Sequence, residues 1–334
     1  MKKLLNNPNH VVEEMLEGYV KAHPDFIKQS VQNKRALVTT RETKENKVGI
    51  LIGGGSGHEP GFLGYVGEGM ADGVAIGNIF ASPSPDPIFE VTKAIDKGAG
   101  VAYLHGNYAG DVMNFGMAAE MADLEEDIKV KIALGSDDVA SAPKEEKEKR
   151  RGIAGEFFIF KSAGAAADFG YDLDNVIRMA EKANENSRSM GVGLSPCALP
   201  QTGEPSFELG ENEMEIGLGH HGEPGLEKGP LGTADEVVER LVTDILNDMP
   251  LTNQDEVAVL VNGLGSTPRM ELYIIFRKVE QMLSEKGIHI YRSYVGDYIT
   301  SLEMGGCSVT LMKLDDELKK AIDHPVNCPM FVQK

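Results

Sequence analysis

The sequence predicts an α/β protein with two α/β domains, the first built on a largely parallel sheet flanked by helices. Strand-like and helix-like runs alternate through the first half, and the strand-like runs end at polar or glycine-rich turns. This alternation is typical of βαβ units. The pattern restarts after a stretch rich in glycine and proline, and 334 residues exceed the commonest size of one domain, so we expect a second domain.

Three strand-like runs justify the first sheet. Residues 47–52 end at a glycine-rich loop, and residues 100–105 end before GNYAGD. Residues 128–135 follow the helix-like residues 115–127 and end at the acidic turn SDDVAS. In parallel sheets the functional loops follow the carboxyl ends of strands, so we expect the site at these turns.

A change of composition near residue 190 marks the expected domain boundary. Residues 155–170 and 172–190 are typical of two helices, whereas residues 191–230 are too rich in Gly, Pro and Glu to form one long helix. Within the latter, MEIGLG could form a short strand. We therefore predict an N-terminal α/β domain over residues 1–188 and a C-terminal α/β domain over residues 189–334.

The C-terminal half supplies the elements of a second, mixed sheet. Residues 233–248 predict an amphipathic helix, and residues 266–287 predict another that begins at Ser-Thr-Pro and ends at Gly287. Buried-type strands are expected over residues 256–265, 288–296 and 307–314.

The overall charge narrows the class of partner. Fifty-two acidic against 33 basic residues give a net charge of −19, which disfavours nucleic acid or an anionic membrane surface. We find neither a signal-peptide pattern nor an apolar run long enough to cross a membrane. Cys197, Cys307 and Cys328 lack metal-ligand spacing, so we expect free thiols, no metal and a cytoplasmic protein.

The loop LIGGGSGHEPGFLGYVG (51–67) carries the first candidate residue, His58. The loop has neither the Gly-Lys-Ser/Thr of a P-loop nor the third glycine of a dinucleotide fingerprint, so we expect no nucleotide site here. Unpaired loop N–H groups could instead hold the oxygens of a small polyol while His58 takes a proton from a hydroxyl. A structural turn with a capping histidine is the alternative.

Two further loops carry candidate residues. In HGNYAGD, Asp111 could orient a histidine or act as a base, or it could simply cap a helix. In GLGHHGEPG, His220 and His221 are adjacent, so in an extended chain they would point in opposite directions. We therefore expect one of them to face a pocket and the other to face solvent, and the spacing disfavours zinc.

Taken together, these motifs resemble one family. GGGSGHEPGFLGYVGEGM, NYAGDVMNF, DDVA, GEPSFEL, NEMEIGLGHHGEPG, GLGSTPRMELY and TSLEMGGCSVTLMKLDDE occur in the order found in the dihydroxyacetone kinase substrate-binding subunits, DhaK, from about residue 10 to the end. The resemblance implies two α/β domains of the kind shared with DegV-like proteins, and a homodimer. It also implies a short-chain ketose as substrate.

The resemblance assigns roles to residues that match the family motifs. It implies that His221 forms a reversible covalent hemiaminal with the ketone, and that His58 (proton acceptor) and Asp111 are acid/base groups at the reacting hydroxyl. It implies further that the substrate is lined by Gly54, Gly55, Ser56, Gly57 and Gly106.

The resemblance also implies where the phosphate comes from. The donor, ATP or ADP with Mg, is expected on a separate helical DhaL-type subunit, possibly supplied by a phosphotransferase-system protein. This chain itself is expected to hold no cofactor.

One position departs from the family pattern. Gly106 stands where the best-known members carry a substrate-contacting lysine, which would enlarge the pocket and admit a four-carbon ketose such as erythrulose. Two further alternatives are a non-catalytic ketose sensor of the same fold and a fatty-acid-binding protein of the DegV type. The presence of both His58 and Asp111 favours a kinase subunit over a sensor.

Overall fold

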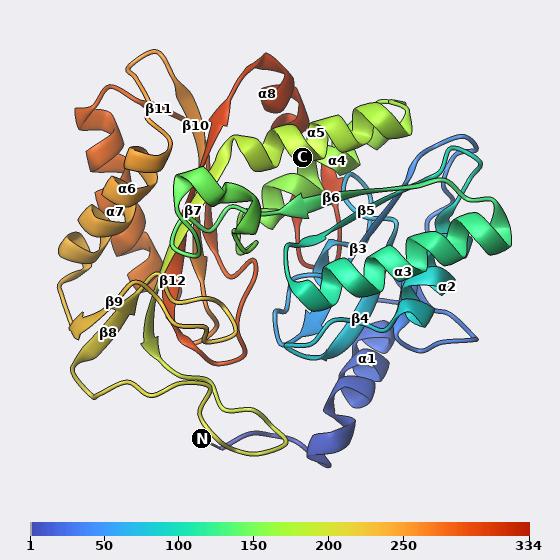
Figure 1. Cartoon of the computed structure of the whole chain (residues 1–334), viewed down its shortest axis with the longest axis horizontal. Helices are drawn as coiled ribbons and strands as arrows, with labels where there is room; N and C mark the ends of the chain where they lie inside the picture. Colours follow the sequence, from blue (N-terminus) through green and yellow to red (C-terminus); the bar gives the residue numbers. More distant parts are fainter. Residues whose placement is uncertain (1) are drawn as a thin grey trace. The chain divides into compact units, whose positions relative to one another are not determined.

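The computed structural model describes residues 2–334 and divides the chain into two compact units (Figure 1). Unit 1 contains the residues up to Gly135, Phe158–Ala183 and Leu318–Lys334, and unit 2 contains Ser136–Phe157 and Asn184–Glu317. This division differs from the predicted domains 1–188 and 189–334, because residues 136–157 belong with unit 2 and residues 318–334 with unit 1.

Unit 1 is built on a six-stranded sheet with the order β1-β2-β4-β3-β5-β6. The strands β4, β3, β5 and β6 are parallel, while β1 and β2 are antiparallel at one edge. The prediction of a largely parallel first sheet is therefore confirmed. The bounds are Ile27–Gln29 (β1), Ala36–Thr39 (β2), Gly49–Ser56 (β3), Gly73–Ile79 (β4), Val101–Gly106 (β5) and Val130–Gly135 (β6).

Helices α2 (Pro85–Ile95) and α3 (Ala109–Glu126) pack on one face of this sheet (Figure 1). Their core contains Val91 and Phe115 of the helices against Leu51 and Tyr103 of the strands. Helix α3 begins six residues earlier than the predicted 115, so the NYAGD turn leads directly into it. Unit 1 also contains α1 (Val11–Ala22) and most of α4 (Glu156–Asp168), α5 (Leu173–Glu185) and α8 (Asp316–Asp323), with 3-10 turns at Pro8–His10 and Leu63–Tyr65. A further 3-10 turn, Lys144–Lys149, lies in unit 2.

Unit 2 contains the second six-stranded sheet, with the order β11-β10-β12-β7-β8-β9. Strands β10 and β11 are parallel and the remaining pairs are antiparallel, so the prediction of a mixed sheet is confirmed. The bounds are Ser187–Ser195 (β7), Glu213–Ile216 (β8), Glu227–Pro230 (β9), Glu256–Gly263 (β10), His289–Gly296 (β11) and Gly305–Leu314 (β12).

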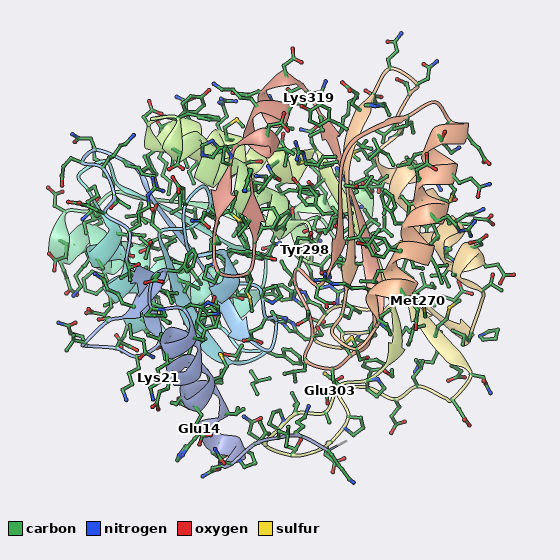
Figure 2. The ribbon with its side chains drawn as sticks, turned by 180° about the vertical axis from the view of Figure 1, so that it is seen from behind. Glu14, Lys21, Met270, Tyr298, Glu303 and Lys319 are labelled. Atoms are coloured by element: carbon green, nitrogen blue, oxygen red, sulfur yellow. The ribbon has the colours of Figure 1, made fainter. Side chains whose placement is uncertain are left out.

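Helices α6 (Ala234–Asp248) and α7 (Arg269–Glu285) cover this second sheet (Figure 1). Helix α6 begins with a capping box, in which the Thr233 side chain and the Glu236 side chain each bond the other residue's backbone N–H. Val238, Leu241 and Ile245 form the buried stripe of α6. Met270, labelled in Figure 2, lies in the first turn of α7 and is 71% exposed.

Strand β7 is a correction to the predicted helix over residues 172–190. The helix, α5, ends at Glu185, and Ser187–Ser195 pairs with β12 over eight residue pairs. The buried hydroxyl of Ser189 contacts that of Thr310 across the pair at 2.6 Å. Tertiary pairing therefore overrides the helical pattern of these small and polar residues.

Two expectations about composition can be compared directly with the described residues. Cys197, Cys307 and Cys328 form no disulfide among the described residues, in line with the expected thiols, and all three are buried. Among residues 2–334, none of the helices has both the length and the apolarity that a membrane crossing requires. A short antiparallel pair in unit 1, β13 (Val326–Asn327) and β14 (Val332–Gln333), completes the secondary structure.

Candidate functional site

Three glycines of the predicted 51–67 loop belong instead to strand β3. Gly53, Gly54 and Gly55 are buried within Gly49–Ser56. A Cβ atom on Gly53 would lie 2.4 Å from the Ala75 carbonyl oxygen, and one on Gly54 would lie 2.5 Å from the Phe62 ring. These glycines therefore permit close packing of the strand against its neighbours.

The turn after β3 is held by its own polar groups. The Ser56 hydroxyl donates to the Gly77 carbonyl at 2.9 Å. The Gly57 N–H donates to the Glu59 carboxylate, at 3.0 Å to Oε2, so the expectation that the loop amides are unpaired is wrong for Gly57. Burial raises the pKa of Glu59, and the Gly57 N–H only partly offsets it. Glu59 thus fixes the turn that contains His58.

His58 is enclosed by aromatic rings. It is 1% exposed, stacks on Phe80 with ring centroids 5.1 Å apart, and meets the edge of Phe62 at 6.2 Å. Phe80 has a φ of 55°, which is uncommon for a bulky residue. The ring of His58 is therefore held in one orientation at the end of β3.

A second histidine, His105, lies at the end of the neighbouring strand β5. It is 1% exposed and stacks on Phe115 of α3 at 4.3 Å. Its Nδ1 donates to the Gly106 carbonyl at 2.8 Å, so Nε2 carries no proton. Among residues 2–334, Nε2 has no hydrogen-bond partner. Burial lowers the pKa of His105 to about 4, with the Gly106 carbonyl acting in the opposite sense.

Unit 1 places His58, Gly106 and Asp111 at the carboxyl ends of its parallel strands. Strands β3 and β5 are adjacent and parallel, so their carboxyl ends lie side by side. Asp111 is in the first turn of α3, four residues before Phe115, and its Oδ1 is shielded from solvent. The positive end of the helix dipole favours a carboxylate at this position.

The remaining predicted residue, His221, belongs to unit 2, in the loop between β8 and β9. His220 is 6% exposed, and the side chain of His221 is 22% exposed. Their ring centroids are 4.5 Å apart, so the expectation that they point in opposite directions is wrong. The reason is local: Gly222 N–H donates to the Gly219 carbonyl, which makes the segment a turn rather than an extended strand.

The carboxylate of Glu223 holds His221. One oxygen accepts from the His221 backbone N–H at 2.9 Å, and the other meets the ring Nδ1 at 2.9 Å. Arg151 Nη1 lies 3.8 Å from Glu223 Oε2. Burial alone would raise the pKa of Glu223, but the hydrogen bond and charge of His221, assisted by Arg151, lower it to about 2.

This pairing determines which ring nitrogen can react. Because an ionised Glu223 can only accept, Nδ1 carries a proton, and in the neutral form of the ring the lone pair is on Nε2. An imidazole oriented through Nδ1 by a carboxylate is the arrangement that nucleophilic and general-base histidines use. A neutral ring in this arrangement can act as a nucleophile or as a base through Nε2.

Glu223 and Arg151 are candidate site residues that the sequence analysis did not identify. A signal for Glu223 was present, since an acidic residue two positions after a histidine in a glycine-flanked turn can reach back to that ring. Arg151 gave no such signal, because 72 residues separate it from Glu223 and only the fold brings them together.

The fold and these loops define a class of protein: a chain of two α/β units, with a histidine-bearing turn at a strand end in one and a carboxylate-bound histidine in the other. More particularly, the chain belongs to the Dak1 family, whose domain model matches residues 17–330. The recognition of the DhaK family from sequence motifs is thereby confirmed.

Two similar proteins illustrate the family. The dihydroxyacetone-binding subunit DhaK of the PTS-dependent dihydroxyacetone kinase 2 of Listeria innocua is 49% identical over 331 residues, which cover 99% of both chains. The L-erythrulose kinase of Pectobacterium atrosepticum is 42% identical over 99% of this chain and 56% of its own length.

Solved structures agree with this assignment. The dihydroxyacetone kinase of C. freundii superposes with a TM-score of 0.91 at 32% identity, over 99% of this chain and 60% of that one. The dihydroxyacetone kinase operon co-activator DhaQ gives a TM-score of 0.88 at 31% identity, over 96% and 98%. A fatty-acid-binding DegV protein of Thermus thermophilus gives 0.52 at 12% identity, over 80% and 100%, and so shares the fold alone.

Proposed function

We propose that this chain is the ketose-binding subunit of a dihydroxyacetone kinase, and that it holds the ketose covalently as a hemiaminal on His221. The observation that carries the proposal is the bond between Glu223 and Nδ1 of His221, which leaves Nε2 as the nucleophile. The similarity to dihydroxyacetone-binding subunits over nearly the whole chain supports the same substrate class.

The addition step balances without a leaving group. The Nε2 lone pair forms a bond to the carbonyl carbon, and the carbonyl π pair moves to oxygen, which takes a proton from water. The Nδ1 proton passes by way of Glu223 to water. The protein thus gains the mass of the whole ketose, and the reverse steps release it.

A covalent bond suits a ligand of this size. A three-carbon sugar has few atoms with which to gain affinity by contact alone. The bond also selects for a carbonyl, because glycerol has similar hydroxyls but no carbon that His221 could attack. Once the ketone is fixed, its terminal hydroxyl can be held in one orientation for transfer.

We assign the transfer step to the residues of unit 1. His58 is the proton acceptor from the terminal hydroxyl, and Asp111 assists as an acid/base group. The phosphoryl donor, a nucleotide with Mg, is carried by a DhaL-type partner. A homodimer in the cytoplasm is part of the same proposal, and the three buried thiols are consistent with that compartment.

A four-carbon ketose is the second candidate substrate. The observation in its favour is Gly106, which ends β5 without the side chain expected from the DhaK motif. The similarity to an erythrulose kinase adds weight to the same substrate class.

The test is intact-mass spectrometry of the native protein after incubation with dihydroxyacetone or erythrulose. We expect an adduct of the whole ketose mass in the native protein and in His220→Ala, and none in His221→Ala, because the Nδ1 of His221 is held by Glu223 so that Nε2 can act as the nucleophile.

The outcomes separate the alternatives. An adduct that persists in His221→Ala would overturn the proposal, and stronger labelling by erythrulose would favour the larger substrate. An adduct without phosphate transfer in the presence of the partner and nucleotide would identify a ketose sensor.

A further inference from the structure

Residues 136–157 are an excursion of the chain into unit 2, flanked on both sides by segments of unit 1. Several contacts hold this excursion, and two of them lie near its ends. Asp138 bridges to Ser189 of β7, and the Phe157 ring packs edge-on against Tyr298, labelled in Figure 2, with centroids 4.9 Å apart. The excursion therefore supplies side chains to unit 2 from a distant part of the sequence.

One of these side chains, Arg151, lies between two carboxylates. Its Nη2 and Nε donate to Asp138 Oδ2 at 2.9 and 3.2 Å, and its Nη1 lies 3.8 Å from Glu223 Oε2. The Arg151 side chain is 15% exposed and that of Asp138 is 1% exposed. The guanidinium is thus held by the buried carboxylate of Asp138 and also lies close to the half-buried carboxylate of Glu223.

The turn that carries His221 leaves space for this arrangement. A Cβ atom on Gly219 would lie 2.3 Å from Glu223 Oε2 and 2.4 Å from Arg151 Nη1. Only a glycine at this position allows the carboxylate and the guanidinium to approach under the backbone.

The ionisable side chains around Arg151 are neighbours of one another, from His221 to Asp137. His221 and Arg151 face Glu223, and Arg151 and Asp137 face Asp138. Burial raises the pKa of Asp138 to about 6, against the attraction of Arg151, and the neighbouring charge of Asp137 adds to the rise.

We propose that Arg151, anchored by Asp138, is a positioning residue for the His221 nucleophile. This inference rests on the proposed function and identifies what regulates the reactivity of the same site. A carboxylate beside an imidazole orients it but also favours its protonated form, which has no lone pair at Nε2. Arg151 balances part of the negative charge of Glu223, so the carboxylate still orients the ring through Nδ1 but attracts a second ring proton less strongly.

The test compares Arg151→Met and Arg151→Lys with the native protein. Adduct formation with dihydroxyacetone is followed by intact mass as a function of ketose concentration and pH. For Arg151→Met we expect affinity at neutral pH to fall about tenfold and the pH midpoint of adduct formation to rise by about one unit. For Arg151→Lys we expect a midpoint close to the native one, because the charge remains, with affinity several-fold lower because the planar fork is lost.

A matched control is Arg240→Met, which removes another arginine of unit 2 that pairs with Glu227 and Asp244 away from His221. It should leave both quantities unchanged. Native affinity and native midpoint in Arg151→Met would overturn the inference. If that variant does not fold, Arg151→Lys decides, since native affinity there would contradict a role for the fork.

A second readout is independent of ketose chemistry. The ring protons of His221 are followed by NMR against pH without ketose, in the native protein and in the variants. An upward shift of their midpoint in Arg151→Met supports the inference even if the native protein forms no adduct, in which case only the proposed function fails. An unchanged midpoint overturns the inference.

Discussion

His105 and His221 show how two histidines of one chain acquire different chemistry from their neighbours. His221 is half-buried and bound through Nδ1 to an ionised carboxylate, whereas His105 is enclosed and bound through Nδ1 to a carbonyl. A carbonyl provides no full negative charge to stabilise a protonated ring, and the burial of His105 favours the neutral form. His105 therefore links the stability of unit 1 to pH.

We expect acid to destabilise unit 1 through His105. The pKa of this side chain is about 4 in the folded protein, against 6.5 for an unperturbed histidine, so the unfolded chain binds the extra proton first. The contribution of neutral His105 to the free energy of unfolding is complete above about pH 6.5. It decreases as the pH falls and does not decrease further below about pH 4. From pH 7 to pH 5 the loss should be about 2 kcal/mol.

The measurement is urea unfolding at pH 7 and pH 5 for the native protein and His105→Asn, which keeps a donor for the Gly106 carbonyl but does not titrate. The variant should lose stability less steeply as the pH falls. Identical pH dependence in both proteins would contradict this account.

At the scale of single residues, the sequence offered candidate histidines more readily than the contacts that surround them. His58 and His221 stand out because they follow or interrupt glycine-rich runs. The role of Glu59 in bonding Gly57, and that of Arg151 beside Glu223, depend on turn geometry and on long-range packing. Local pattern contains no information on either.

Among the secondary-structure elements, strand β3 depends most on the absence of side chains. Its buried glycines let β4 and the Phe62 ring approach closer than any Cβ would permit. The sequence pattern places these glycines in the loop and ends the strand at residue 52, because glycine is unfavourable inside a strand. The close packing that explains them is visible only in three dimensions.

We expect Gly54→Ala to destabilise unit 1 by about 1–3 kcal/mol, because the added methyl would lie 2.5 Å from the Phe62 ring. The matched control is Gly18→Ala in helix α1, where nothing lies within 4 Å of the new Cβ. That change should stabilise by about 0.5–1 kcal/mol through helix propensity. Urea or thermal unfolding measures both, and a neutral Gly54→Ala would show that the Phe62 ring moves freely.

Helices with clear start and stop signals were the easiest elements to predict. The predicted 233–248 helix agrees with α6 within one residue because its amphipathic stripe and Thr233 cap are both local features. The same kind of pattern wrongly extends the preceding helix into β7, because the buried serines of β7 acquire strand character only by pairing with β12.

For the whole molecule, the proposed function divides the work between the units. In that proposal His221, a residue of unit 2, binds the carbonyl, and His58, a residue of unit 1, is the group that receives the proton of the hydroxyl. Binding and transfer should therefore be separable by mutation.

We expect His58→Ala to keep the ketose adduct while phosphate transfer with the DhaL-type partner and nucleotide falls by about 10²-fold or more. Adduct formation is measured by intact mass and transfer by ketose phosphate production. Unchanged turnover would remove His58 from the chemistry, and loss of the adduct would make it a binding residue instead.

For the whole chain, the fold class was predictable from the sequence, but the assignment of segments to the two units was not. Alternating runs and a break in composition predicted two α/β bodies with a parallel and a mixed sheet, and both sheets have those forms. The membership of residues 136–157 and 318–334 was not predictable, because those segments join a unit through contacts distant in sequence rather than through any local signal.

The excursion over residues 136–157 has a practical consequence for any attempt to express half of this protein. A gene fragment beginning at residue 184 would encode His221 and its glutamate but would omit the arginine and the aspartate that stand behind them. Such a truncated polypeptide would also leave the Ser189 edge of β7 without its bridge to Asp138. The surroundings of this imidazole are thus assembled from two stretches of the gene, and any contiguous segment that encodes both must also carry residues 158–183 of unit 1.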